Sequence, residues 1–305
     1  MSLYRDDPEL CKRDLAKYLV KGELSLFLGA GISASVGMPN WKDLTKNVLI
    51  NVGFQNEANK ISDQTTDAEY RNLMTKVRKE LNHDAVKFKE IVKKSLYSKD
   101  KLFDLGNFVP PLLSSLGAMM MGSKRGSVKQ VVTLNYDNVL ELYLSYHGFY
   151  TQSVSVLPVR LRDADVTIYH PHGYLPHGSK DEDSEDIILD QHSYDCILGA
   201  ETDSPWRKLT RNILKSKVVL CVGLSNRDPN LNTLVGSVMK EMTKAGLEQP
   251  VGFWLHCDED AKDEEFEELT KFVPVRVRRH KDYPQFILDI CKKASILYKK
   301  NMMEL

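Results

Sequence analysis

The sequence predicts an α/β fold with a doubly wound, mostly parallel sheet and a helical insertion. Short apolar runs, such as residues 24–28 and 218–222, have the character of strands that are buried on both faces of a sheet. Segments with helical periodicity separate these runs, and such alternation is typical of parallel sheets whose strands are joined by helices. A glycine-rich turn follows the first run directly, which places that turn at the carboxyl end of a strand.

The predicted elements follow one another regularly along the chain. Strands are predicted where apolar and β-branched residues cluster, and helices where apolar residues recur with helical spacing. Proline at a first turn marks several helix starts, as at Pro110-Pro111, because its missing N–H is not needed there. The predicted strands are Leu24–Leu28, Gln130–Leu134, Val166–His170, Ile187–Leu189, Val218–Val222, Val251–His256 and Val273–Val277. The other predicted helices are Asp7–Lys21, Trp41–Val52, Val139–His147, Pro205–Lys215, Pro229–Ala245, Ala261–Phe272 and Tyr283–Lys299.

Residues from about 56 to 101 interrupt this order. The segment is highly charged and places Tyr70, Val77 and Leu81 at helical spacing. We expect a helical insertion that lies over the ligand cleft, and solvated helices without a functional role are the alternative. The whole chain, residues 1–305, is predicted to be a single domain.

The composition excludes several classes of protein. Hydrophobic residues make up 42% of the chain and charged residues 28%, so we expect a substantial core rather than disorder. The 42 Lys and Arg residues balance the 42 Asp and Glu residues, which gives no indication of binding to nucleic acid or to an anionic membrane. The five cysteines include no Cys-x-x-Cys pair, and no stretch is apolar enough to span a bilayer. We therefore expect a cytoplasmic protein without a structural zinc site.

The turn after the first strand has the features of a dinucleotide site. Gly29 and Gly31 lack a Cβ atom, so main-chain amides can approach a pyrophosphate closely. Ala30 lies between them, and Ser33 offers a hydroxyl near the N-terminus of a following helix, where anions are favoured. The third glycine of Gly-x-Gly-x-x-Gly is missing, so a simple tight turn is the alternative. A dinucleotide bound at this turn is typical of a Rossmann-like sheet.

Three further polar segments follow predicted strands, at the edge where ligands bind in open α/β sheets. Asn135 and Asp137 follow the second strand. The amide suits a sugar hydroxyl or a water, and Asp137 suits either a ligand or the cap of the next helix. Gly223, Ser225 and Asn226 follow a later apolar strand and are candidates for contacts with ribose or phosphate.

The remaining segment is His-Pro-His-Gly at residues 170–173. Histidine titrates near neutral pH, which suits general acid–base catalysis, and His172 is the candidate for that role. A lone histidine is more often structural than catalytic. Because His170 and His177 lie close by in the sequence, composition alone does not choose among the three.

Taken together, the four segments resemble the sirtuin superfamily in their order and spacing. Gly-Ala-Gly-Ile-Ser with Gly-Met-Pro, within residues 29–39, is similar to the first NAD motif of that family, and Leu-Asn-Tyr-Asp at 134–137 is similar to the second. His-Gly at 172–173 resembles the catalytic histidine motif, and Gly-Leu-Ser at 223–225 resembles the late ribose motif. The sequence is closer still to the sirtuin-like branch of bacterial antiphage proteins, which similarly combines Thr-x-Asn-Tyr-Asp with Gly-x-Ser-x-x-Asp-Pro-Asn-Leu.

The resemblance implies an NAD hydrolase that cleaves the nicotinamide–ribose bond. Protein deacylases of the family carry a four-cysteine zinc module, whereas only Cys196 and Cys221 lie in the corresponding interval here. They also have Pro-Asp-Phe-Arg where this chain has Pro-Asn-Trp-Lys at 39–42. The antiphage branch mostly hydrolyses NAD, which depletes the nucleotide in the infected cell. The alternatives are an NAD-dependent protein deacylase or ADP-ribosyltransferase, and a non-catalytic NAD-binding regulatory module.

The resemblance also implies roles for individual residues. Asn135 would hold the water or the ribose, and His172 would act as general base or activate a hydroxyl, because an oxocarbenium-like transition state needs a fixed ribose and a proton acceptor. The pyrophosphate would contact Gly29, Ala30, Gly31 and Ser33, and the ribose and adenine would contact Asp137, Gly223, Ser225 and Asn226. The substrate would be NAD, and no zinc or other metal is expected. A homo-oligomer contact, or a separate defence partner such as an ATPase or an Argonaute-like protein, would move the helical insertion to admit NAD.

Overall fold

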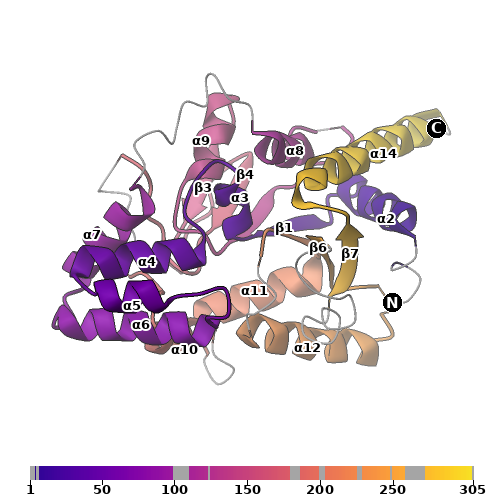
Figure 1. Cartoon of the computed structure of the whole chain (residues 1–305). Coiled ribbons are helices and arrows are strands. Elements are labelled where there is room, and N and C mark those ends of the chain that lie inside the picture. Colours follow the sequence, from indigo (N-terminus) through magenta and orange to yellow (C-terminus); the bar gives the residue numbers. More distant parts are fainter. Residues whose placement is uncertain are drawn as a thin grey trace.

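One parallel sheet organises the protein. Its seven strands lie in the order β3-β4-β2-β1-β5-β6-β7, and every neighbouring pair is parallel. The computed structural model, drawn in Figure 1, confirms the predicted α/β fold with a doubly wound sheet. It describes residues 4, 7–98, 110–122, 124–178, 186–198, 203–224, 229–247, 249–257 and 272–303.

The two central strands, β1 and β5, mark the place where the winding reverses. From β1 the chain first builds the sheet toward β2, β3 and β4, and then returns to place β5 on the other side of β1. Leu28, the last residue of β1, pairs with Thr133 of β2 and with Val222 of β5, so these three strands end at the same level. The strands are β1 (Leu24–Leu28), β2 (Gln130–Thr133), β3 (Thr151–Val154), β4 (Val166–Tyr169), β5 (Val218–Val222), β6 (Gly252–Cys257) and β7 (Val273–Val277).

Helices cover both faces of this sheet (Figure 1). Helix α14 packs against α2 and α8 on one face, and α11 and α12 pack together on the other. The helices are α2 (Pro8–Val20), α3 (Ala30–Ala34), α4 (Trp41–Val52), α5 (Gln55–Lys60), α6 (Asp67–Glu80), α7 (Ala85–Leu96), α8 (Pro111–Met120), α9 (Val139–Tyr146), α10 (Gln191–Leu198), α11 (Pro205–Ser216), α12 (Pro229–Lys244) and α14 (Tyr283–Met303), with a short 3₁₀ turn η1 (His280–Asp282) before the last.

The central strands are buried at every position, and apolar at all but Ser25, because they contribute side chains to two cores. Leu26 of β1 lies in the core beneath α2, α8 and α14, whereas its neighbour Phe27 lies in the core beneath α11 and α12. Leu220 and Cys221 of β5 divide in the same way. Successive side chains of a strand point to opposite faces of a sheet, so a strand covered on both faces has no solvated position.

Side-chain caps fix where several helices begin. The side-chain oxygens of Asp7, Asn40 and Ser204 accept hydrogen bonds from main-chain N–H groups in the first turns of α2, α4 and α11. Helix α6 begins with a capping box, in which Thr66 and Glu69 each bind the other's main-chain N–H. These caps explain why the predicted starts of α2, α4 and α11 agree with the structure to within one residue.

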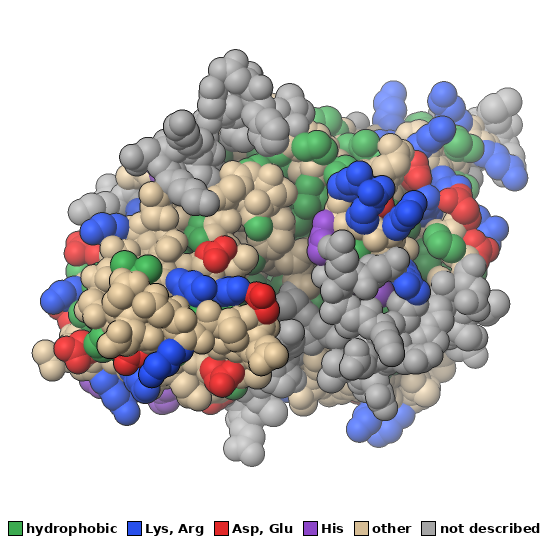
Figure 2. All heavy atoms as spheres, viewed as in Figure 1, with side chains coloured by type: hydrophobic (Ala, Val, Ile, Leu, Met, Phe, Trp, Pro, Cys, Tyr) green, Lys and Arg blue, Asp and Glu red, His purple; other side chains and the backbone are tan. Residues whose placement is uncertain are grey.

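The segment predicted as a helical insertion contains α5, α6 and α7, which connect β1 to β2 together with α3, α4 and α8. Helix α4 packs against all three, and Figure 1 shows the group beside one end of the sheet. Lys and Arg side chains lie among Asp and Glu side chains over this group in Figure 2. Among the described helices, none combines the length and the apolar character needed to cross a membrane.

The structure corrects the prediction at residues 187–189, which form no strand. The main-chain N–H of Ile188 donates to the carbonyl of His172, and the carbonyl of Ile188 accepts from the Tyr136 hydroxyl, so this apolar run is an irregular buried segment. Strand β3 and helices α3 and α10 were not predicted. The predicted helix at 261–272 lies outside the described residues except for Phe272.

Candidate active site

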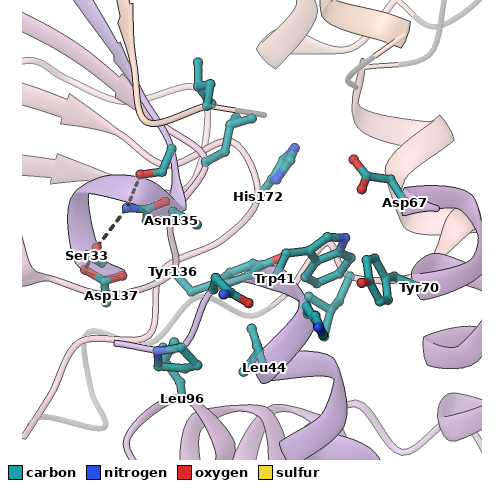
Figure 3. Close-up of a pocket in the computed structure, with 18 of the residues that line it drawn as sticks. Ser33, Trp41, Leu44, Asp67, Tyr70, Leu96, Asn135, Tyr136, Asp137 and His172 are labelled. Carbon is teal, nitrogen blue, oxygen red and sulfur yellow. Dashed lines mark hydrogen bonds between the residues drawn. The ribbon is translucent and has the colours of Figure 1, made fainter. Parts of the chain in front are cut away.

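A cavity of about 400 Å³ opens at the carboxyl ends of the central strands. Its volume falls in the range of small-molecule sites, and it lies at the point where the sheet winding reverses. Figure 3 shows Ser33, Asn135, Asp137 and His172 around it, on the side of the sheet, and Trp41, Asp67 and Tyr70 opposite, on the helical segment. Eight of the ten residues predicted to bind or cleave the ligand line this cavity, namely Gly29, Ala30, Gly31, Ser33, Asn135, Asp137, His172 and Gly223.

The glycines of the first turn are needed because the loop after β1 passes close to the loop after β5. A Cβ atom on Gly29 would lie 2.5 Å from the carbonyl oxygen of Gly223, and one on Gly31 would lie 2.8 Å from the Gly223 Cα. The Gly31 N–H donates to the Gly223 carbonyl at 2.9 Å, and the Gly29 N–H donates to Val222 at 3.1 Å. The loops after β1 and β5 are therefore bonded main chain to main chain, and these two N–H groups serve that contact.

We expect Gly29→Ala to destabilise the protein by about 1 to 3 kcal/mol, because the added methyl group must displace main-chain atoms of Gly223 and Leu224. Gly236→Ala is the matched control. Gly236 lies inside α12 with nothing within 4 Å of an added Cβ, so alanine there should be neutral or stabilising by up to about 1 kcal/mol. Urea unfolding of both variants measures the difference, and equal stabilities would contradict the close approach of the two loops.

Asn135 is held on the first turn by its own side chain. Its Nδ2 donates to the Gly29 carbonyl at 3.1 Å and to the Ser33 hydroxyl at 2.9 Å (Figure 3). Its main-chain N–H donates to the Thr133 hydroxyl at 3.2 Å. Both amide hydrogens are therefore directed to the β1 turn, and the amide oxygen is the remaining polar atom of this side chain at the cavity.

Asp137 is buried, and its carboxylate accepts from the Ser33 hydroxyl at 2.9 Å and from the Val139 N–H at 3.1 Å. The second bond caps the start of α9, as the alternative interpretation of this residue predicts. Burial raises the pKa of Asp137 from 3.8 to about 6, against the two hydrogen bonds, which lower it. Asp137 thus lines the cavity and also ties the β1 turn to α9.

The raised pKa of Asp137 predicts a pH-dependent stability. Because the pKa of Asp137 is higher in the folded protein than in the unfolded chain, the protonated carboxyl group stabilises the fold. This stabilisation is complete below the pKa of the unfolded chain and is lost as the pH rises through about 6. From about pH 4.5 to about pH 7.5, the wild-type free energy of unfolding should therefore fall by roughly 2 kcal/mol relative to Asp137→Asn, which keeps an accepting oxygen but does not titrate. Denaturant unfolding of both proteins at the two pH values tests this, and parallel pH profiles would contradict it.

The structure shows which of the three neighbouring histidines faces the cavity, a choice that the sequence alone does not make. His170 is fully buried, and both of its ring nitrogens face other protein groups. His172 lines the cavity, and its ring lies 6.0 Å from that of Tyr194 in an edge-to-face arrangement. His177 is exposed and packs its ring on Tyr97. Of the three, His172 is the histidine that a bound ligand would meet.

The wall formed by the helical segment was not predicted residue by residue. Trp41 and Tyr70 pack edge to face at 5.8 Å between ring centroids, and the carboxylate of Asp67 points into the opening across from His172 (Figure 3). The helical periodicity of this segment predicts Tyr70 as a core position only. Nothing in its spacing indicates that α6 meets the carboxyl edge of the sheet.

Helix α6 also contacts α10 at the edge of the cavity. Arg71 Nε donates to Gln191 Oε1 at 2.7 Å, and the guanidinium carbon lies 4.5 Å from the centre of the Tyr194 ring. Two turns further along α6, Arg78 pairs with Asp190 and donates to the Ile187 carbonyl at 2.8 Å. Any movement of the helical segment that widens the cavity here would break these contacts, and such movement stays a prediction.

Two predicted contacts, Ser225 and Asn226, lie outside the described residues. Within the described ranges, no group of three or more His, Cys, Asp and Glu side chains is arranged to hold a metal ion. Of the two cysteines in the zinc-module interval, Cys196 is exposed on α10 and Cys221 is buried in β5. The expectation that the protein binds no zinc stays a prediction.

Comparison with known proteins bears on this cavity. Residues 129–275 match the family model of the SIR2-like domain. This match covers just under half of the chain. The match contains Asn135, His172 and Gly223, whereas the Gly29 turn precedes it. A SIR2-like domain implies NAD binding.

A curated relative is also similar to this chain. The NAD(+) hydrolase ThsA of Bacillus cereus (strain MSX-D12) is 24% identical over 235 residues, which cover 75% of this chain and 43% of that protein. The chain therefore spans less than half the length of this relative.

Proposed function

We propose that this SIR2-like domain hydrolyses NAD at the bond between nicotinamide and ribose, giving nicotinamide and ADP-ribose. The observation that carries the proposal is the convergence of Asn135, His172 and the Gly29 turn on one cavity at the winding reversal of the sheet. The similarity to an NAD(+) hydrolase supports the same reaction.

The chemistry of the bond sets what the cavity must supply. Cleavage passes through an oxocarbenium-like state, in which the ribose carries developing positive charge and a water must approach the anomeric carbon. The Asn135 amide oxygen accepts a hydrogen bond from that water or from a ribose hydroxyl. The His172 imidazole takes up the proton released when water attacks, a step that typically contributes about 10²- to 10⁴-fold to a rate.

The binding residues are assigned from the resemblance to the sirtuin motifs. Ser33 and the β1 turn, with Ala30, hold the pyrophosphate, and the Gly223 loop and Asp137 contact the ribose and adenine. Ser225 and Asn226 are assigned to the same end from the sequence. The aromatic pair Trp41 and Tyr70 gives the opposite wall an apolar face, which keeps bulk solvent away from the site while the single attacking water is held by Asn135.

Incubating the purified chain with NAD and following the products by chromatography tests the proposal. Nicotinamide and ADP-ribose in equal amounts, with no need for an acceptor protein, are expected. An absolute requirement for an acyl-lysine peptide would identify a deacylase, and ADP-ribose attached to protein would identify a transferase. Tight binding of NAD without any product would identify a regulatory module.

The resemblance to the antiphage branch extends the proposal to NAD depletion in infected cells. A bacterial host that carries the gene, compared with one that carries His172→Ala, should lose NAD after phage addition. Equal NAD levels in the two hosts, with the purified enzyme active, would remove the defence role and leave the enzymatic one.

A further inference from the structure

A buried ionisable pair lies behind the cavity. Glu141 of α9 and His170, which follows β4, approach at 2.7 Å between Oε1 and Nε2, and both residues are buried. Neither lines the cavity. Placing a carboxylate and an imidazole in the interior is costly unless their remaining polar atoms are hydrogen-bonded, so the other contacts of the pair indicate its purpose.

The second ring nitrogen of His170 contacts the candidate catalytic segment. His170 Nδ1 lies 3.0 Å from the main-chain carbonyl oxygen of Asn135. A carbonyl oxygen can only accept, so Nδ1 must carry the hydrogen of this bond. A second hydrogen bond joins Nε2 to the Glu141 carboxyl group. The two bonds together fix the orientation of the His170 ring and keep a hydrogen on Nδ1. The Ser153 hydroxyl donates to the same carboxylate oxygen at 3.1 Å and holds it in place.

The turn at residues 170–173 directs the side chains of His170 and His172 to opposite sides. The Gly173 N–H donates to the His170 carbonyl at 3.1 Å, and Gly173 has a φ of +104°, which favours glycine. A Cβ at this position would lie 2.6 Å from the main-chain oxygen of Asp186. The tight turn leaves His170 in the interior, beside the Tyr174 ring at 4.4 Å, while His172 faces the cavity (Figure 3).

Resting on the proposed function, we propose that His170 and Glu141 are positioning residues for the reaction. Glu141 fixes the His170 ring, and the His170 Nδ1–H holds the main chain of Asn135, so that the amide oxygen of Asn135 stays where water or ribose must be bound. Asn135 is also held by its main-chain N–H on Thr133 and by its side chain on the β1 turn. The hydrogen bond from His170 Nδ1 is the one that fixes the main-chain carbonyl of Asn135.

Two variants separate this role from a general contribution to stability. Asparagine places its amide nitrogen near the position of Nδ1, and glutamine places its amide nitrogen near Nε2. His170→Asn therefore keeps the donor to Asn135, whereas His170→Gln keeps the contact with residue 141 and loses that donor. Both are made together with Glu141→Gln, so that no unpaired carboxylate stays buried, and Glu141→Gln alone is the reference.

The expected result is a difference in kcat between the two double variants. With NAD as substrate, His170→Asn with Glu141→Gln should stay within about 10-fold of the reference. His170→Gln with Glu141→Gln should fall by about 10²-fold in kcat, because misplacing a reacting group by about an ångström has effects of that size. KM should change little. Equal kcat values, or a loss confined to KM, would overturn the proposal.

A spectroscopic measurement on the wild-type protein tests the same bond without any turnover. In protein labelled with ¹⁵N-histidine, the ring beside Tyr174 should show a proton bonded directly to Nδ1 that exchanges slowly with water. A bare Nδ1 would overturn the proposal, even if the double variants fail to fold. If wild-type protein binds NAD without cleaving it, the proposed function fails, and a protonated, protected Nδ1 still supports the structural half of this inference.

Discussion

Asn135→Ala is expected to lower the rate of nicotinamide release from NAD by at least about 10²-fold. The substitution removes the amide oxygen that binds water or ribose, and it removes the two hydrogen bonds to Gly29 and Ser33 that hold the β1 turn. Loss of one group that contributes to the transition state typically has an effect of about 10²- to 10³-fold. Chromatographic initial rates at saturating NAD measure the change.

A matched control shows whether the loss is specific. Asn51→Ala removes another asparagine that donates a side-chain hydrogen bond, to Ser95 at 2.8 Å, but on the exposed side of α4 and outside the cavity. That variant should keep the wild-type rate. The two lost bonds of Asn135→Ala should cost about 1 kcal/mol each, so both variants should remain folded in thermal unfolding. A folded Asn135→Ala protein with wild-type turnover would remove Asn135 from the mechanism.

His172→Ala is expected to lower kcat by about 10²- to 10⁴-fold, the usual contribution of a general base. The histidine lines the cavity and is only partly buried as a residue, so we expect the variant to remain folded. NAD binding should persist, since the pyrophosphate and adenine contacts come from other residues. Calorimetric titration with NAD and a turnover assay on the same preparation separate binding from catalysis.

His177→Ala is the control for this prediction. It removes a histidine five positions along the same segment that is exposed and packs on Tyr97. Its kcat should equal that of the wild type. Loss of activity in His177→Ala but not in His172→Ala would reverse the assignment of the general base.

Most of the sheet was predictable because its central strands are buried on both faces. Runs such as Leu24–Leu28 and Val218–Val222 are apolar at every position or nearly so, which distinguishes them from helices and loops. Strand β3, Thr151–Val154, lies at the sheet edge with alternating burial and carries mostly polar residues, so it gives no such signal. The apolar run at 187–189 gives the signal of a buried strand but is not one, since it is buried beside the cavity without pairing in the sheet.

The site residues that could be predicted from the sequence are those that directly follow strands. Asn135 and Gly223 come within two residues of strand ends, and parallel strands bring their carboxyl ends to one edge. Trp41, Tyr70 and Tyr194 reach the cavity through the packing of α4, α6 and α10, which no local pattern encodes. The two roles within His-Pro-His-Gly likewise depend on the turn at Gly173.

The most direct test of the account is the fate of water oxygen when the purified chain consumes NAD in ¹⁸O-labelled water. Attack of water at the anomeric carbon predicts one ¹⁸O atom in each ADP-ribose, with one nicotinamide released per NAD consumed, and formation of this product at least about 10²-fold slower with His172→Ala. Nicotinamide release without labelled ADP-ribose, or NAD recovered unchanged from a protein saturated with it, would contradict the claim that this cavity hydrolyses NAD.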